Sequence, residues 1–292
     1  MLLKVPSKLP NVGMQADWIE ASCLFGHDVT VTRSEVNVAL ESSTDYQEDE
    51  INSIIEDAFG EISRRGNILK EHPMKVDRNK IGRLASWEDT PAYSFMLLLA
   101  TNHFYTRTRI TNENRGTPAK LFEGLATAAL NKYLPAAINI GWPRKGMPES
   151  LKECLELFSA ISNEMMRGHP EIADYAKDED VNIIAWSPID SRSGQVMLLV
   201  QCTIEKDWRK SASKIDFETW RNIMNFATPP RKALAFPQVG GLSQWKYQSS
   251  KSGILFDRLR LAYLFPAAST TCLKRKILDW SLSQRSNLRW FN

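Results

Sequence analysis

The chain has 292 residues, of which 43% are hydrophobic and 24% are charged, and its formal net charge is +3. This length exceeds that of most single domains, so we expect two domains in an ordinary globular protein. No apolar run approaches the roughly 20 residues of a membrane span, and the first residues lack the apolar core of a signal peptide. The four cysteines include no Cys-x-x-Cys pair, which argues against structural zinc. These features predict a cytoplasmic protein without membrane contact.

Residues 1–115 carry mostly helical patterns. The segment 47–65 has isoleucines on one face at helical spacing and acids on the other, which predicts an amphipathic helix. Residues 91–101 are apolar nearly all round and begin with proline, which predicts a buried helix. No catalytic constellation occurs in this part of the sequence. We therefore expect residues 1–115 to form a mainly helical recognition or assembly domain.

Residues 116–292 alternate between helix and strand patterns, which is typical of an α/β domain. A helix is expected over residues 117–133, with Glu123 beside its apolar side. Short branched, apolar runs at 181–186 and 196–200 flank a polar turn and predict a hairpin of buried strands. Further along, we expect a strand at 231–237, a loop at 240–245, a strand from 253 that turns helical near Asp257, and a last helix at 270–283.

Both strands of the predicted hairpin carry an amide, Asn182 in the first and Gln201 at the end of the second. A buried amide without partners costs roughly 1–3 kcal/mol. Two amides on paired strands therefore indicate a shared polar site. The alternative is that the two amides only satisfy each other within a core.

The sequence around the hairpin resembles the PD-(D/E)xK nucleases. The pattern is a helix-borne Glu, an acid in the first hairpin strand, and Glu or Gln in the second. The likeness is strongest to the restriction-endonuclease branch and to bacterial defence-type proteins with a Gln-Cys variant of the motif. It covers about residues 117–210. The residues that carry it are Glu123, Lys177-Asp178, Val181-Asn182, Ala185-Trp186, Gly194-Gln195, Gln201-Cys202 and Trp208.

This resemblance implies a restriction-endonuclease-like mixed sheet flanked by helices, and a metal-dependent deoxyribonuclease activity. Hard Mg²⁺, or Mn²⁺, takes carboxylate and carbonyl oxygens. The catalytic residues carried over are Glu123, Asn182, Gln201 and Lys206. The implied metal ligands are Glu123, Asn182, Gln201, the carbonyl of Cys202, and Asp180.

The sequence departs from the family pattern at two positions. Asn182 stands where the pattern has an Asp. Thr203 stands where the pattern has a Lys, two residues after the Glu or Gln of the second strand. Lys206, and after it Lys210, would then supply the positive charge. Three accounts of Asn182 are open: Asp178 or Asp180 provides the missing charge, the protein is a natural pseudo-nuclease, or an Asp was replaced to inactivate the enzyme.

Basic residues are concentrated near the C-terminus. Residues 251–292 hold eight lysines and arginines against two aspartates, as phosphate contacts require, although a solvated helix surface would have the same composition. The DNA-binding candidates are Arg144, Lys145, Lys210, Lys274, Arg275 and Lys276.

Together these features predict an Mg²⁺-dependent endonuclease that cleaves DNA. It would act as the effector of a bacterial anti-phage system, with a partner subunit or as a homo-oligomer. The first alternative is a catalytically dead nuclease-fold subunit that only binds DNA or a partner protein. A second alternative is a nuclease directed at RNA.

Overall fold

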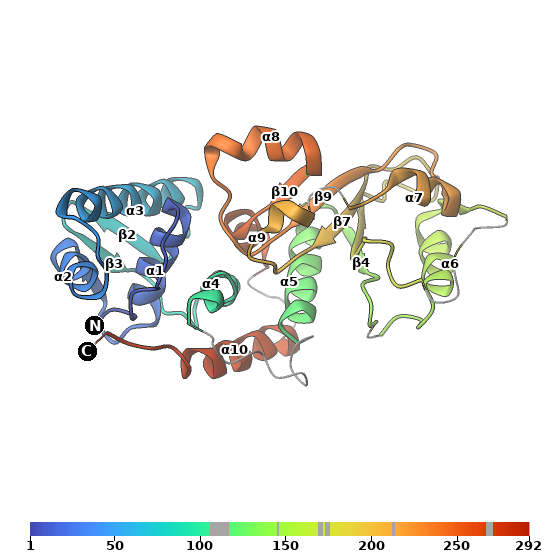
Figure 1. Ribbon diagram of the computed structural model, residues 1–292. Coiled ribbons are helices and arrows are strands. Elements are labelled where there is room, and N and C mark those ends of the chain that lie inside the picture. The colour runs from blue at the N-terminus through green and yellow to red at the C-terminus, as the bar shows by residue number, and fades with distance from the viewer. Residues whose placement is uncertain are drawn as a thin grey trace.

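The computed structural model describes residues 1–105, 117–144, 146–168, 172, 176–211, 214–266 and 271–291. The described residues form a mixed α/β structure, in which a helical part with a small sheet lies beside a part built on a five-stranded sheet (Figure 1). The expected boundary at residue 115 lies outside the described residues, and the division into 1–115 and 116–292 stays a prediction. None of the described helices is both long and apolar enough to cross a membrane.

The N-terminal part is helical, as predicted, but it also contains a small sheet that the sequence did not reveal. The isoleucines of the predicted amphipathic helix are buried, and the helix over 91–101 is confirmed as part of α4. The three strands pair antiparallel in the order β1-β3-β2. The elements of this part are α1 (Val12–Phe25), β1 (Thr30–Thr32), α2 (Arg33–Ser43), α3 (Glu48–Ile68), β2 (Met74–Asp77), β3 (Lys80–Arg83) and α4 (Pro91–Tyr105).

The larger sheet has the strand order β10-β9-β7-β6-β4 and is mixed. The strands β4, β6 and β7 are antiparallel, whereas β7, β9 and β10 run parallel. The predicted hairpin is confirmed as β6 and β7, with Ile183 opposite Val200. The strand bounds are β4 (Ala136–Asn139), β6 (Ile183–Trp186), β7 (Met197–Cys202), β9 (Arg231–Ala235) and β10 (Ile254–Phe256).

Helices cover both faces of this sheet. Side chains alternate between the two faces of each strand, so they enter two different cores. Ile183 and Val200 pack in a core with α5 (Thr117–Tyr133), whose bounds match the prediction. Ile184 and Leu199 point the other way, into a core with α6 (Leu151–Ser162) and α7 (Phe217–Ile223). The sheet is therefore buried on both sides, and its polar site has to lie at an edge.

Two predictions about the second half were wrong or incomplete. The expected loop at 240–245 is instead the start of a helix, α8 (Leu242–Ser252), which has no side-chain cap at Gly241. Strand β4 was not foreseen. The expected change from strand to helix at Asp257 is confirmed, because Asp257 caps α9 (Arg258–Leu264) by accepting from the backbone N–H of Arg260. The remaining short elements are β5 (Met165–Met166), η1 (Trp208–Ser211) and β8 (Met224–Asn225).

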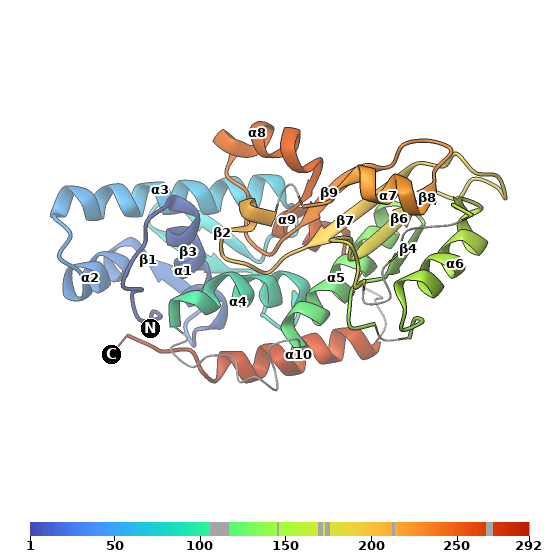
Figure 2. The same cartoon turned by 45° about the vertical axis from the view of Figure 1, so that its right-hand side comes forward.

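The last helix, α10 (Thr271–Arg285), returns the chain to its start. It runs along α4 and α5 (Figure 2). Beyond it, Trp290 pairs with Leu3, and the backbone N–H of Phe291 donates to the carbonyl of Leu2. Residues from the two ends of the chain therefore complete one core.

A buried group of charges joins the two parts; we call it the N-terminal charge cluster, and its members are Asp17, Glu20, Arg65 and Arg258. Arg65 donates to Asp17 at 2.7 Å and to Glu20 at 2.9 Å. Arg258, from α9, also donates to Asp17. Two acids and two bases thus balance each other in a site that solvent barely reaches.

Candidate functional site

The structure brings the predicted helix glutamate to the point where β4, β6 and β7 meet. Glu123 lies in the first half of α5 and is only 6% exposed. One helical turn earlier, Lys120 forms an ion pair with it, at 2.6 Å between Nζ and Oε2. We call Lys120, Glu123, Gly141, Asp178 and Asn182 the Glu123 site.

Gly141, just after β4, lets Glu123 and Asn182 approach the same point of the backbone. A methyl group on Gly141 would lie 2.6 Å from Glu123 Oε2 and 3.1 Å from Asn182 Nδ2. The first distance is shorter than any ordinary contact. A side chain at this position would therefore displace the carboxylate of Glu123.

The amide of Asn182 has a defined orientation. Its Oδ1 accepts a hydrogen bond from the backbone N–H of Cys202 at 2.7 Å, and a backbone N–H can only donate. Its Nδ2 therefore faces the acids and donates to Asp178 Oδ2 at 3.1 Å. Asn182 thus holds a carboxylate in place, and its own oxygen is already engaged.

A strained turn brings Asp178 to this position. Glu179 and Asp180 both have left-handed backbone conformations, with φ of 45° and 59°. Such conformations are rare for residues other than glycine and recur at functional sites. The turn closes with a hydrogen bond from the N–H of Val181 to the carbonyl of Asp178. Of the two acids expected to replace the missing charge, Asp178 contacts Asn182, whereas Asp180 is exposed on the turn.

The charges of the Glu123 site are not balanced. Burial raises the pKa of the Glu123 carboxyl above its usual range, and the negative charge of Asp178 adds to this rise. Lys120 and the side chain of Asn139 favour the charged form, but they only partly offset the burial. Burial and the nearby Glu123 also raise the pKa of the Cys202 thiol, which keeps that thiol neutral. An added cation would therefore stabilise the ionised carboxylates.

The two polar residues at the end of β7 point to opposite faces of the sheet. Cys202 packs with the core under α5, on the side of Glu123. By strand alternation, Gln201 shares the opposite face with Leu199. Gln201 is 7% exposed. Asn182 and Gln201 therefore do not serve as each other's partner, because the amide of Asn182 is bonded to Cys202 and Asp178.

The candidate lysine after β7 lies in a neighbouring cleft. Lys206 lines a cavity of about 930 Å³ between the start of α1 and the loop that leads into α8. Thr203, in the family's lysine position, is buried, and its hydroxyl accepts from the backbone N–H of Glu205. The charged groups that act on Glu123 include Lys120 but not Lys206. Lys120 is thus the cation that this geometry adds to the predicted set.

The predicted DNA-binding residues fall in different surroundings. Arg144 donates to the backbone carbonyls of Glu149 and Lys177, and it thereby holds the loop after β4. Lys145 lies outside the described residues. Lys210 is exposed, with Nζ 3.9 Å from Asp207.

The basic residues of α10 lie close to α5. Leu273 packs against Gly124. A methyl group added to that glycine would lie 3.3 Å from Leu273 Cδ1. Gly124 follows Glu123 directly. Arg275 and Lys276 are exposed on the next turn of α10, and Lys274 is half-buried. Residues that are about 150 positions apart in the sequence therefore come together where α10 packs on α5.

Sequence reasoning did not single out Lys120 or Gly141. Lys120 precedes Glu123 by three positions on a helix, the spacing at which side chains meet, so this pair could have been found. Gly141 gave no local signal, because its importance depends on the approach of α5 to β4.

The donor groups of the Glu123 site are oxygens of the kind that Mg²⁺ prefers. Among the described residues, no three His, Cys, Asp or Glu side chains are grouped closely enough to form a ready metal site. Neither a scan against protein-family models nor searches of curated proteins and of solved structures gave a match. Functional interpretation therefore depends on this geometry.

Proposed function

We propose that this chain is a metal-dependent endonuclease that cleaves DNA, with the Glu123 site as its catalytic centre. The observation that carries the proposal is the convergence of the Glu123 and Asp178 carboxylates with Lys120 at the edge of a mixed sheet. A helix-borne Glu beside a hairpin of that sheet is the arrangement that the resemblance to PD-(D/E)xK nucleases implies. We extend the proposal to the fold and regard the sheet as restriction-endonuclease-like.

The residues present fit a divalent ion with few protein ligands. Mg²⁺ commonly binds through one or two carboxylates, with water and substrate phosphate completing its shell. Glu123 and Asp178 would hold it, and the raised pKa of Glu123 supports a site that lacks positive charge. Asn182 would not be a ligand, because its Nδ2, which can only donate, faces Asp178. When bound, the ion would stabilise charge on the phosphate and acidify a water molecule.

The side chains have separate roles in this proposal. Asn182 holds Asp178 in position by a hydrogen bond. Lys120 lies beside Glu123 and would stabilise negative charge that develops on the scissile phosphate. Lys206 remains the alternative cation, from the adjacent cleft. Gln201 faces the other side of the sheet and would act only through the position of β7.

The basic residues nearby favour a nucleic acid, and the choice of DNA follows from the resemblance to PD-(D/E)xK nucleases. Arg275 and Lys276 are exposed on the helix that packs against the residue after Glu123, and they would contact phosphates of the bound strand. A role as the effector of a bacterial anti-phage system, with a partner subunit or as a homo-oligomer, completes the proposal.

A nuclease-fold subunit without activity is the second candidate. It is favoured by the replacement of the pattern's acid by Asn182, whose hydrogen bonds satisfy the site without an ion. The two candidates differ in whether metal binds.

The test combines metal binding with plasmid cleavage. Calorimetric titration with Mg²⁺ and Mn²⁺ should show binding that is lost in Glu123→Ala and Asp178→Asn. Plasmid cleavage should be lost in the same variants, and in Lys120→Ala, but not in the exposed control Glu88→Gln. If the native chain and Asn182→Asp neither bind metal nor cleave DNA or RNA, the nuclease proposal is wrong, and the candidate of a subunit without activity replaces it.

A further inference from the structure

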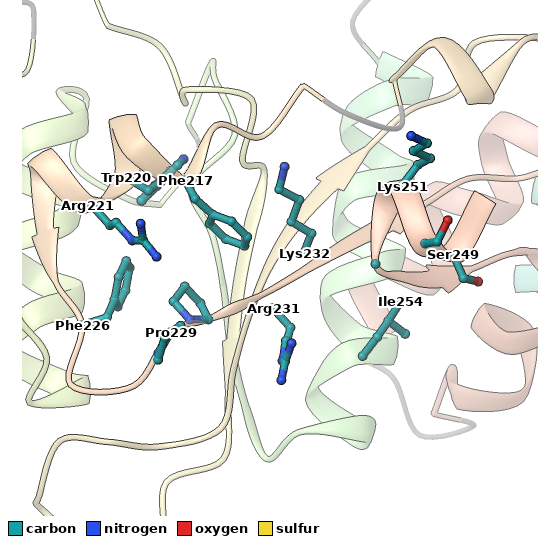
Figure 3. A pocket seen from close by; sticks show the side chains of 13 residues that line it. Phe217, Trp220, Arg221, Phe226, Pro229, Arg231, Lys232, Ser249, Lys251 and Ile254 are labelled. Carbon is teal, nitrogen blue, oxygen red and sulfur yellow. The ribbon is translucent and has the colours of Figure 1, made fainter. Parts of the chain in front are cut away.

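A second concave site lies far from Glu123, on the other face of the sheet. It is a pocket of about 720 Å³ between α7, the start of β9, and the junction of α8 with β10. We call it the basic–aromatic pocket, and its defining residues are Phe217, Arg221, Phe226, Arg231, Lys232 and Lys251 (Figure 3).

The charges that line the pocket all have one sign. Four cationic residues and no acidic residue contribute to its walls. Arg221 pairs with Glu218, but both side chains are well exposed, so this pair is easily exchanged for another partner. Among the described residues, Arg231, Lys232 and Lys251 take part in no ion pair. A negatively charged ligand would therefore meet at least three available cations.

Apolar and aromatic surface lies between these cations. Lys232 sits over the ring of Phe217, with its Nζ 5.0 Å from the ring centre. Phe217 and Phe226 are both half-buried, so each ring keeps an accessible surface. The combination of flat aromatic surface and surrounding positive charge matches a nucleobase joined to a phosphate.

The pocket and the Glu123 site lie at opposite ends of the parallel strands. Arg231 pairs with Leu198 at the start of β7, whereas Ala235 pairs with Cys202 at its end. The four-residue separation corresponds to about 13 Å along the strand. Lys232 also alternates with Ala233, which faces the core under α5. The pocket is therefore distinct from the Glu123 site.

We infer that the basic–aromatic pocket binds a segment of single-stranded nucleic acid, with phosphates on Arg221, Lys232 and Lys251 and a base on Phe226. The arrangement of the cations favours a strand over a single phosphate. Arg221 and Lys251 lie on opposite sides of the pocket, with Lys232 between them, whereas the side chain of Arg231 points the other way from β9 (Figure 3). A row of charges of this kind follows successive phosphates of a backbone. Binding here does not require that the Glu123 site cleave.

The test measures binding in EDTA, so that cleavage plays no part. A fluorescent 12-residue oligothymidine and the corresponding duplex are titrated with the full chain and followed by anisotropy at several salt concentrations. The pocket variant is Arg221→Ala with Lys232→Ala and Lys251→Ala. The matched control removes three exposed cations from β2, β3 and their turn: Lys75→Ala, Arg78→Ala and Lys80→Ala.

We expect the pocket variant to bind the single strand at least about tenfold more weakly, and its log–log salt dependence to fall by about two units. Phe226→Leu should weaken binding by about tenfold with an unchanged salt dependence, because it removes stacking but no charge. The control variant should retain the native affinity. Circular dichroism and thermal unfolding establish that each variant is folded.

Three results would overturn the inference. They are native affinity in the pocket variant, equal losses in the pocket and control variants, and displacement of the strand by thymidine monophosphate at the same nucleotide concentration. Because plasmid cleavage is assayed separately, failure of this site and failure of the proposed nuclease activity can be told apart.

Discussion

The N-terminal charge cluster and the Glu123 site are two groups of buried charges, and they differ in how completely those charges are balanced. In the N-terminal charge cluster, burial alone would raise the pKa of Glu20, but Arg65, His72 and Arg258 hold it well below its usual range. At Glu123, burial prevails over Lys120 and the pKa is raised. The first cluster is complete without a further ion, whereas the second would gain from one.

This difference separates a structural from a functional use of buried carboxylates. A network of opposite charges holds elements together, and here it joins α1 and α3 to α9 through Asp17. A buried carboxylate whose negative charge is poorly compensated lowers the stability of the fold. Such carboxylates are common at catalytic and binding sites. Variants that alter one cluster at a time should show the two behaviours separately.

The largest effect is expected from Arg65→Met. It leaves Asp17 and Glu20 buried without their shared cationic partner, and breaking such a pair costs about 3–5 kcal/mol. Urea unfolding measures the loss. The neighbouring Arg64→Met is the control, since Arg64 is partly exposed and its pair with Glu61 contributes about 1 kcal/mol or less. Equal losses in the two variants would mean that the cluster is not a structural network.

The stability of Asn182→Asp, unlike that of Arg65→Met, should depend on metal. The change replaces a donor 3.1 Å from Asp178 by a second carboxylate, so we expect a loss of about 1–3 kcal/mol in EDTA. Mg²⁺ at a hundredfold excess over its dissociation constant should raise the free energy of unfolding of this variant by about 2.7 kcal/mol. Thermal unfolding with and without Mg²⁺ measures both.

The matched control for this variant is Asn37→Asp, because Asn37 also donates to a carboxylate, that of Glu41 at 2.7 Å, but on the surface. It should lose little stability and should not respond to Mg²⁺. A metal response of the same size in both variants would contradict a specific site at Asp178.

Gly141→Ala tests the close approach of Glu123 to the backbone. The new methyl would lie 2.6 Å from Glu123 Oε2, so the carboxylate has to move away from Lys120. We expect a cost of about 1 kcal/mol and loss of metal binding in calorimetry. Gly60→Ala in α3 is the control, because nothing lies within 4 Å of its added methyl and alanine favours the helix by about 0.5–1 kcal/mol. Unchanged metal binding in Gly141→Ala would argue against Glu123 as a ligand.

The smallest effect is the pH dependence of Glu123→Gln without metal. A carboxyl whose pKa is raised by folding contributes stability below its unfolded-state pKa, and this contribution is lost as pH rises through the folded-state value. Glutamine has no such loss, so the variant should gain stability relative to the native chain between about pH 4 and pH 8. Urea unfolding across that range measures the difference, with the exposed Glu88→Gln as the control for one lost charge. A variant that loses relative stability with rising pH would show that Lys120 outweighs burial.

The sequence predicted those parts of the fold that have a strong local signal. The helix 117–133 and the β6–β7 hairpin follow from periodicity and from the turn residues between the strands. Strand β4 was missed because its four residues are only half-buried and have no alternating pattern. Helix α8 was missed because two glycines precede it and its N-terminus has no side-chain cap.

The candidate site was predictable only in part, for a similar reason. Glu123 was predicted from the resemblance to PD-(D/E)xK nucleases, and Asn182 was predicted because it is an amide within a buried apolar run. The choice of Asp178 over Asp180 depends on left-handed backbone at Glu179, which no local pattern indicates. The opposite directions of Gln201 and Cys202 follow from strand alternation, but which of the two faces α5 is a property of the packed sheet.

The return of the chain to its own beginning has a consequence for biosynthesis. Leu288, Trp290 and Phe291 pack on the core formed by α1, α2 and α3, and Arg285 donates to the carbonyl of Phe25. A ribosome makes those helices long before it makes the residues that cover them. The first core therefore gains its last contacts only after residues 285–291 have been synthesised, and such long-range closure is slow. A nascent chain would expose this apolar surface throughout translation, and it would need protection from aggregation until the two ends meet.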